Sequence, residues 1–173
     1  MVSTNISHDP VDWIRRLPRY TELGEREQNV LAAICDVVQY SAGEMILEQD
    51  TRPPVIPLLV QGEVAVNYRL ESGAHVELTS MESPELIGFL WFLDSEVRCP
   101  LDFLAKKASV CLNIRTLDLE NLYVSGNALS YPILAYLYTR SAEQFRMFND
   151  VFRKLYEDPK DTYLRLVEQT SPT

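Results

Sequence analysis

The sequence has 173 residues and a formal net charge of -9, from 16 basic and 25 acidic side chains. That length suits one well-buried core with a short appendage, and a content of 46% apolar and 24% charged residues is typical of an ordinary globular chain. The negative charge offers the phosphate backbone of DNA no broad basic surface, so we expect the chain alone to bind DNA poorly. Because neither a signal peptide nor an apolar run of membrane-spanning length is visible, we expect a soluble, cytoplasmic protein that does not bind membranes.

Two short helices are expected near the N-terminus. Asp9 and Pro10 have the character of a helix cap and a first helical residue, and Pro18 ends the helix that they begin. In the segment that follows, four residues share one face at helical spacing: Leu31, Ile34, Cys35 and Val38. This pattern predicts a second helix with Cys35 turned towards the core.

Between about residues 37 and 117 the pattern changes to short apolar runs with period-two alternation, separated by turn residues. Val110, Leu112 and Ile114 illustrate the alternation. Short, numerous strands are typical of an all-β sandwich or barrel, and a jelly roll is the most economical choice. We therefore predict a mainly β fold with flanking helices.

Helical spacing returns after residue 117, first in a short helix to Leu122 and then in one long helix over about 130–157. Apolar residues at every third or fourth position of the long helix form a heptad seam with one polar interruption, at Ser141. The seam consists of Leu134, Tyr138, Phe145, Phe148, Phe152 and Leu155. The stripe can pack on the chain's own barrel or on a second copy. Its length and its aromatic residues favour a second copy, as in a parallel homodimer.

Four segments resemble the bacterial Crp/Fnr family of transcription regulators. AGEMILEQD (42–50) resembles the family's "aGevIfreGD" turn and strand, VQGEVAV (60–66) its "lsGeveV" strand, and LESGAHVEL (70–78) its "dGrevvL" hairpin. The segment 85–122 resembles the phosphate-binding cassette, the final strands and the helix that follows them. Together these segments identify a Crp/Fnr-type resemblance over about residues 19–157.

The resemblance implies a double-stranded β-helix, or jelly roll, of the cyclic nucleotide-binding type over residues 1–128, followed by a dimerisation helix over 129–157. Residues 158–173 resemble the first helix of the family's winged helix-turn-helix domain, which implies a truncated DNA-binding domain. The implied function is an effector-sensing and dimerisation module of a transcription regulator, acting as a homodimer. A small anionic molecule is the candidate effector, and contact with DNA requires a helix-turn-helix domain in the full gene product.

The first half of the cassette departs from the family at the ribose contact. The family's Gly-Glu-Leu-Ala becomes Gly88, Phe89, Leu90 and Trp91, so a phenyl ring replaces the carboxylate that accepts a hydrogen bond from the ribose 2′-hydroxyl. A hydrogen bond to a charged group contributes about 1.5 to 3 kcal/mol, so its loss weakens cyclic nucleotide binding about ten- to a hundredfold. Gly88, Phe89 and Leu90 are candidate ligand-binding residues of an altered pocket.

The second half of the cassette keeps an arginine but changes its neighbours. The family's Pro-Arg-Ser/Thr-Ala becomes Val97, Arg98, Cys99 and Pro100. Arg98 retains the guanidinium that pairs with the cyclic phosphate, Cys99 offers a thiol in place of a hydroxyl, and Pro100 lacks a backbone N–H. Arg98, Cys99 and Pro100 complete the candidate ligand site. Arg98 is either an anchor for an anionic effector or an exposed loop arginine, alone or paired with Glu96.

Catalytic machinery is not visible in the sequence. His8 and His75 are the only histidines, which excludes the clustered metal site of a cupin, and no nucleophile or phosphate-loop motif is present. We therefore predict no enzymatic activity, no metal and no cofactor. Three functions remain open. We favour the sensor and dimerisation half of a regulator with a degenerate pocket over a working cyclic nucleotide-binding module and over a ligand-free protein that forms heterodimers with a full-length regulator.

Overall fold

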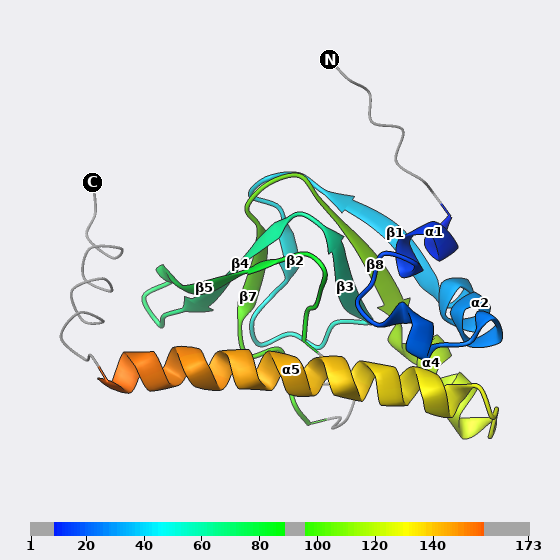
Figure 1. Cartoon of the computed structure of the whole chain (residues 1–173). Helices are drawn as coiled ribbons and strands as arrows, with labels where there is room; N and C mark the ends of the chain where they lie inside the picture. Colours follow the sequence, from blue (N-terminus) through cyan, green and yellow to red (C-terminus); the bar gives the residue numbers. More distant parts are fainter. Residues whose placement is uncertain (1–8, 89–95, 158–173) are drawn as a thin grey trace, which may run out of the picture.

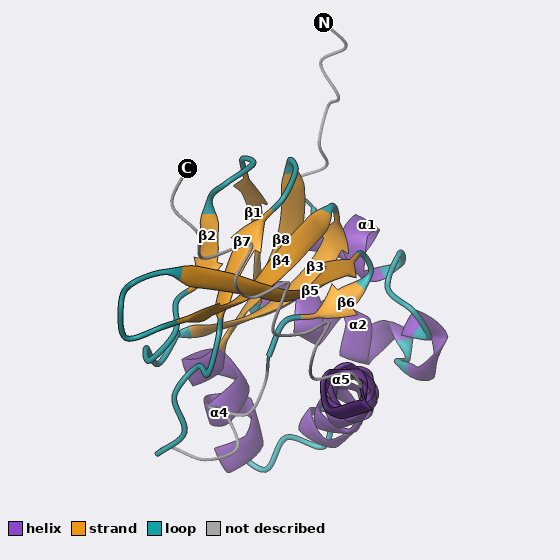
Figure 2. Ribbon diagram, turned by 90° about the vertical axis from the view of Figure 1, so that its left-hand side faces the viewer, coloured by secondary structure: helices purple, strands orange, loops and turns teal. Residues whose placement is uncertain are grey.

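A computed structural model describes residues 9–88 and 96–157 of the chain (Figure 1). Two antiparallel four-stranded sheets form its centre: sheet A has the strand order β1-β8-β3-β6, and sheet B has the order β2-β7-β4-β5. The strands are β1 (Cys35–Tyr40), β2 (Met45–Leu47), β3 (Val55–Gln61), β4 (Glu63–Arg69), β5 (His75–Glu82), β6 (Glu85–Leu86), β7 (Asp102–Ala105) and β8 (Ser109–Arg115). Helices flank the two sheets (Figure 2), so the predicted mainly β fold with flanking helices is confirmed.

The first N-terminal helix begins where the sequence predicts but ends earlier. It stops at Ile14, four residues before Pro18, so Pro18 is not the residue that ends it. Helix α1 (Pro10–Ile14) is capped by Asp9, whose Oδ1 accepts a hydrogen bond from the backbone N–H of Val11 at 2.9 Å. The 3-10 turn η1 (Tyr20–Glu22) separates α1 from α2 (Glu25–Ala33). Both α helices contribute buried apolar side chains to the core beside sheet A.

Cys35 is not helical, so the predicted extent of the second helix is wrong. α2 ends at Ala33, and Cys35 is the first residue of β1. β1 pairs with β8 along its whole length, and this long-range pairing outweighs the local helical spacing. The expected inward position of Cys35 is confirmed, because the residue is buried in the core.

Strand β8 contributes to two hydrophobic cores at once. Val110, Leu112 and Ile114 belong to a cluster that sheet A forms with the helices. Cys111 belongs to a second cluster, which is lined mainly by sheet B. Successive side chains of a strand point to opposite faces, so β8 is buried on both sides.

Helix α4 (Thr116–Val124) leads into α5 (Ser130–Glu157), which has the bounds predicted for the long helix. Its 28 residues correspond to a length of about 42 Å. α5 runs along one side of both sheets in Figure 1 and is seen end-on in Figure 2. Gln144 attaches it to sheet A, because its Nε2 donates a hydrogen bond to the backbone oxygen of Leu86 at 2.6 Å. None of the helices in the described residues combines the length and apolar character needed to cross a membrane.

Candidate functional site

Gly88 marks the start of the predicted cassette, directly after β6 and Ile87. Ile87 is fully buried, and its N–H donates to the backbone oxygen of Pro57 at 2.8 Å, which fixes this entry to sheet A. Gly88 has φ +63, a left-handed conformation that residues with a Cβ adopt only with strain. Two of the predicted ligand residues, Phe89 and Leu90, lie outside the described residues.

The described residues 96–100 form the cassette arm, and Arg98 lies exposed on it. Its Nη1 donates a hydrogen bond to the backbone oxygen of Asp50 at 3.0 Å. A guanidinium carries five N–H donors, so this contact, which uses one of them, leaves donors for an anion. Pro100 is also exposed on the arm.

The Cys99 thiol points away from its exposed neighbour Arg98. Cys99 is fully buried in the sheet B cluster, and its Sγ donates to the backbone oxygen of Leu101 at 3.1 Å. Burial raises the pKa of the Cys99 thiol to about 11, so the thiol stays protonated at neutral pH. The cassette arm therefore brings Arg98 to the surface and places the side chain of Cys99 in the core.

A tight turn at residues 48–51 holds the cassette arm in place. The N–H of Asp50 donates to the backbone oxygen of Cys99 at 2.8 Å, and the N–H of Cys99 donates to the backbone oxygen of Thr51 at 2.8 Å. Asp50 has φ 64, the left-handed conformation that Asp and Asn tolerate better than most residues. The AGEMILEQD string does not by itself reveal that its end pairs with the arm.

Four residues at the 48–51 turn form a polar cluster, which we define as Gln49, Arg69, His75 and Asp102. Gln49 and Asp102 are buried, Arg69 is partly buried and His75 is exposed. Asp102 is fully buried, and its Oδ1 accepts a hydrogen bond from the backbone N–H of Gln49 at 2.6 Å. Its Oδ2 lies 3.1 Å from Nδ1 of His75 and 4.0 Å from Nε of Arg69, yet neither contact has hydrogen-bond geometry. Sequence reasoning missed this cluster, because its members belong to four segments and follow no local pattern.

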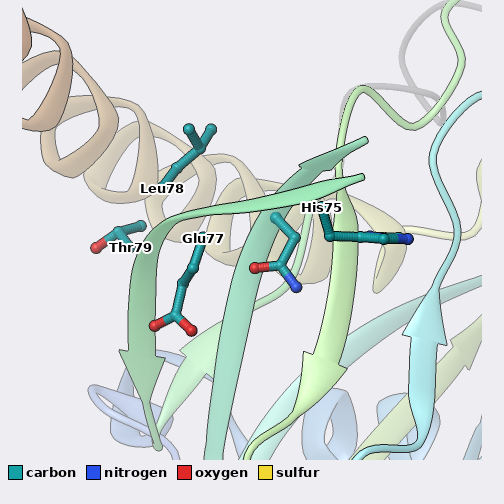
Figure 3. Close-up of a pocket in the computed structure, with 5 residues that line it drawn as sticks. His75, Glu77, Leu78 and Thr79 are labelled. Atoms are coloured by element: carbon teal, nitrogen blue, oxygen red, sulfur yellow. The ribbon is translucent and has the colours of Figure 1, made fainter. Parts of the chain in front are cut away.

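Beside this cluster, β4 and β5 form a surface depression with a volume of about 570 Å³. Figure 3 shows that the side chains of His75, Glu77, Leu78 and Thr79 point in different directions. Glu77 is engaged by Lys106, whose Nζ lies 2.9 Å from Glu77 Oε1. The lining therefore does not converge on one point, as a small-molecule site would. Within the part of the chain that the structure describes, no three His, Cys, Asp or Glu side chains are placed to hold a metal ion.

The predicted heptad seam of α5 lies at the border between a buried and an exposed face. Leu134 and Ser141 are buried within the chain, and Leu134 belongs to the hydrophobic core beside sheet A. Tyr138 and Phe145 are exposed, with 51% and 46% of their surface accessible. The side chains of the three remaining seam residues lie outside the described part of the structure: Phe148, Phe152 and Leu155.

Solved structures share this fold at low sequence identity. The chain is similar to a cyclic nucleotide-binding domain from Methylobacillus flagellatus, with a TM-score of 0.70, 13% identity, and coverage of 87% of this chain and 82% of that chain. A regulatory protein from Silicibacter pomeroyi, whose name describes cAMP binding, has a TM-score of 0.62 at 15% identity, and the match covers 83% of this chain and 66% of that chain. For a transcriptional regulator from Thermotoga maritima the TM-score is 0.58, the identity 20%, and the coverage 77% and 98%. The chain thus spans just under two thirds of the Silicibacter protein.

A family model matches the sequence, although no individual curated protein does. The family model of the cyclic nucleotide-binding domain matches residues 37–125, just over half of the chain. The matched range runs from β1 to the end of α4 and includes the 48–51 turn, the polar cluster and the cassette arm. The chain therefore belongs to the cyclic nucleotide-binding domain family.

Proposed function

We propose that this chain is the effector-sensing and dimerisation module of a Crp/Fnr-type transcription regulator whose cyclic nucleotide pocket has degenerated. The observation that carries the proposal is the split between Arg98 and Cys99: the guanidinium is exposed, and the adjacent side chain is buried in the core. The module acts in the cytoplasm without catalysis or a cofactor. It contacts DNA only through a helix-turn-helix domain in the full gene product.

The anion-binding capacity of the cassette arm is reduced to one side chain. A cyclic phosphate is bound most strongly when a guanidinium acts together with neighbouring hydroxyl and backbone N–H donors. In this chain the hydroxyl is replaced by the Cys99 thiol, which donates to the backbone oxygen of Leu101 instead. Pro100 has no N–H to donate. Arg98 alone attracts phosphates and carboxylates, which favours weak binding of an acidic metabolite over tight binding of a cyclic nucleotide.

The outer face of α5 supports the dimerisation half of the proposal. Tyr131, Tyr138 and Phe145 recur every seven residues and are 78%, 51% and 46% exposed. Ala135 and Ala142, also exposed, lie between the rings on the same face. A parallel copy of α5 would bury this aromatic stripe, with the small residues giving the rings room to interdigitate.

Two alternative functions have observations in their favour. Retention of Arg98 within a matched cyclic nucleotide-binding domain favours a working cyclic nucleotide sensor. The exposed aromatic stripe also suits a ligand-free protein that forms heterodimers with a full-length regulator.

Isothermal titration calorimetry with cyclic AMP and cyclic GMP tests the degenerate pocket. We expect dissociation constants no tighter than about 100 µM, equivalent to only about 5.5 kcal/mol of binding free energy. Phe89→Glu, which restores the family's carboxylate, is expected to tighten binding, and Arg98→Ala to remove it. Arg26→Ala, an exposed arginine of α2, is the matched control. Low-micromolar binding by the wild type that Arg98→Ala abolishes would establish the working sensor instead.

A further inference from the structure

We infer that Gln49 and Asp102 are positioning residues for Arg98, and that they act by locking the 48–51 turn against sheet B. The inference rests on the proposed role of Arg98 as the anion-binding side chain. It adds the residues that set where the Arg98 guanidinium lies, none of which belongs to the cassette itself.

Gln49 is the last residue but one of the 42–50 string, directly before Asp50. The side chain is buried and pairs with both backbone groups of Arg69, the last residue of β4. Its Oε1 accepts from the N–H of Arg69 at 2.7 Å, and its Nε2 donates to the backbone oxygen of Arg69 at 3.3 Å. A side-chain amide thus makes the pair of hydrogen bonds that a neighbouring strand would make.

The backbone of Gln49 is held as firmly as its side chain. Its N–H donates to Asp102 Oδ1 at 2.6 Å, and its oxygen accepts from Nη2 of Arg69 at 3.0 Å. All four polar groups of Gln49 are therefore bound by β4 and β7. Arg69 extends the attachment to the neighbouring residue of the turn, because its Nη1 lies 3.1 Å from Oε1 of Glu48.

Asp102 lies in a place where burying a carboxylate costs folding free energy. Its side chain is fully buried, and its Oδ2 makes no hydrogen bond to the described residues. A buried charge with an unsatisfied oxygen destabilises a fold unless its remaining contacts offset the loss of water. The short contact from the N–H of Gln49 and the charge of Arg69 are such contacts, and both fix the position of the turn.

The turn transmits its position to the cassette arm through three hydrogen bonds. Two are backbone bonds, which join the N–H of Asp50 to Cys99 and the N–H of Cys99 to Thr51. The third joins Nη1 of Arg98 to the backbone oxygen of Asp50. Because Asp50 follows Gln49 directly, any displacement of Gln49 moves the acceptor that orients the Arg98 guanidinium.

Amide hydrogen exchange, measured by NMR, tests this coupling without a ligand. Gln49→Ala and Gln49→Gly both remove the side-chain pair with Arg69. We expect exchange at the amides of Asp50 and Cys99 to accelerate at least about tenfold relative to the amides of the β1–β8 ladder. Asp102→Asn keeps an acceptor for the N–H of Gln49 but removes the charge, so a smaller acceleration at the same two amides is expected. This isosteric variant carries the test if the Gln49 variants fail to fold.

Asn113→Ala is the matched control, since Asn113 is also a buried amide but bonds to the hydroxyl of Tyr40 in sheet A at 3.0 Å. Because Asn113 lies in β8, Asn113→Ala is expected to accelerate exchange in the β1–β8 ladder at least as much as at the amides of Asp50 and Cys99. Unchanged relative exchange at Asp50 and Cys99 in all the Gln49 and Asp102 variants would overturn the inference.

Titration with inorganic phosphate, followed at the side-chain Nε–H signal of Arg98, connects the coupling to binding. We expect the phosphate-induced shift of the wild type to shrink in Gln49→Ala and to persist in Asn113→Ala. If phosphate leaves the wild-type Arg98 signal unchanged while Gln49→Ala still accelerates exchange, the anion-binding role fails and the positioning role stands. A full wild-type shift in a Gln49→Ala protein with accelerated exchange would overturn the positioning role.

Discussion

The inner and outer faces of α5 both carry large apolar side chains, but these are buried to very different degrees. Leu137 is 0% exposed and packs in the core beside sheet A, whereas the next residue, Tyr138, is 51% exposed. The inner face shares its core with sheet A and the N-terminal helices. The outer face presents aromatic rings at seven-residue spacing to solvent. One amphipathic pattern in the sequence therefore contains two stripes, one buried in the core and one exposed.

The heptad seam lies on the border between these two faces for a geometric reason. In a helix with 3.6 residues per turn, positions four residues apart differ by about 40° around the axis. That difference places Leu134 on the buried side of the border and Tyr138 on the exposed side. Ser141 and Phe145 repeat the same division one heptad later. A seam inferred from spacing alone therefore mixes core residues with surface residues.

The largest expected effect comes from the inner face. Leu137→Ala removes a fully buried side chain from the core and should lower the free energy of unfolding by about 2 to 5 kcal/mol. Tyr138→Ala, measured at the same low protein concentration, should lower it by less than about 1 kcal/mol, because half of the ring is already in water. Urea denaturation of both variants gives the comparison. Equal losses would mean that the two faces are not energetically distinct.

A smaller effect is expected from alkaline pH, again on the inner face. Burial raises the pKa of the Tyr136 phenol, whose hydroxyl donates to the backbone oxygen of Pro18 at 3.1 Å, to about 12. An unfolded tyrosine ionises near pH 10. The folded pKa is the higher one, so the contribution to stability is complete below about pH 10 and is lost as the pH rises towards 12.

Tyr136→Phe isolates this contribution. Between about pH 9 and pH 11 the wild type should lose about 1 kcal/mol more of its free energy of unfolding than Tyr136→Phe. Denaturation curves at several pH values measure the difference, and the other buried acids cancel because both proteins contain them. Parallel losses in the two proteins would show that Tyr136 is as accessible to solvent in the folded chain as in the unfolded one.

The elements that the sequence predicts well depend on local signals. Asp9 and Pro10 define the start of α1 by their own chemistry, and the long periodic run from 130 to 157 corresponds to α5. Cys35 was misplaced because its strand is stabilised by pairing with β8, almost 80 positions further along the chain. A helical period over four residues cannot reveal such a partner.

The geometry around the candidate site residues depends on long-range contacts, which the sequence does not show. The ligand-binding role of these residues stays a prediction. The resemblance to the cassette predicts Gly88, Arg98, Cys99 and Pro100 as ligand-binding residues. The structure places the last three on the cassette arm. The direction in which the Cys99 side chain points depends on the packing of sheet B, which no local string encodes. The contact between Gln49 and Asp102 joins residues 53 positions apart and becomes visible only when β2 and β7 are paired.

The smallest effect on the stability of a single chain is expected from the outer face, where the effect on association should be largest. Tyr138→Glu combined with Phe145→Glu replaces two half-exposed rings and should change the unfolding free energy of the monomer by less than about 1 kcal/mol. In a parallel dimer the four introduced carboxylates would face one another across the interface, so sedimentation equilibrium should show a dimeric wild type and a monomeric double variant. Tyr123→Glu, at an exposed ring on α4, is the control and should remain dimeric. A wild type that sediments as a monomer at tens of micromolar would leave the stripe without a second copy and remove the dimerisation half of the proposed function.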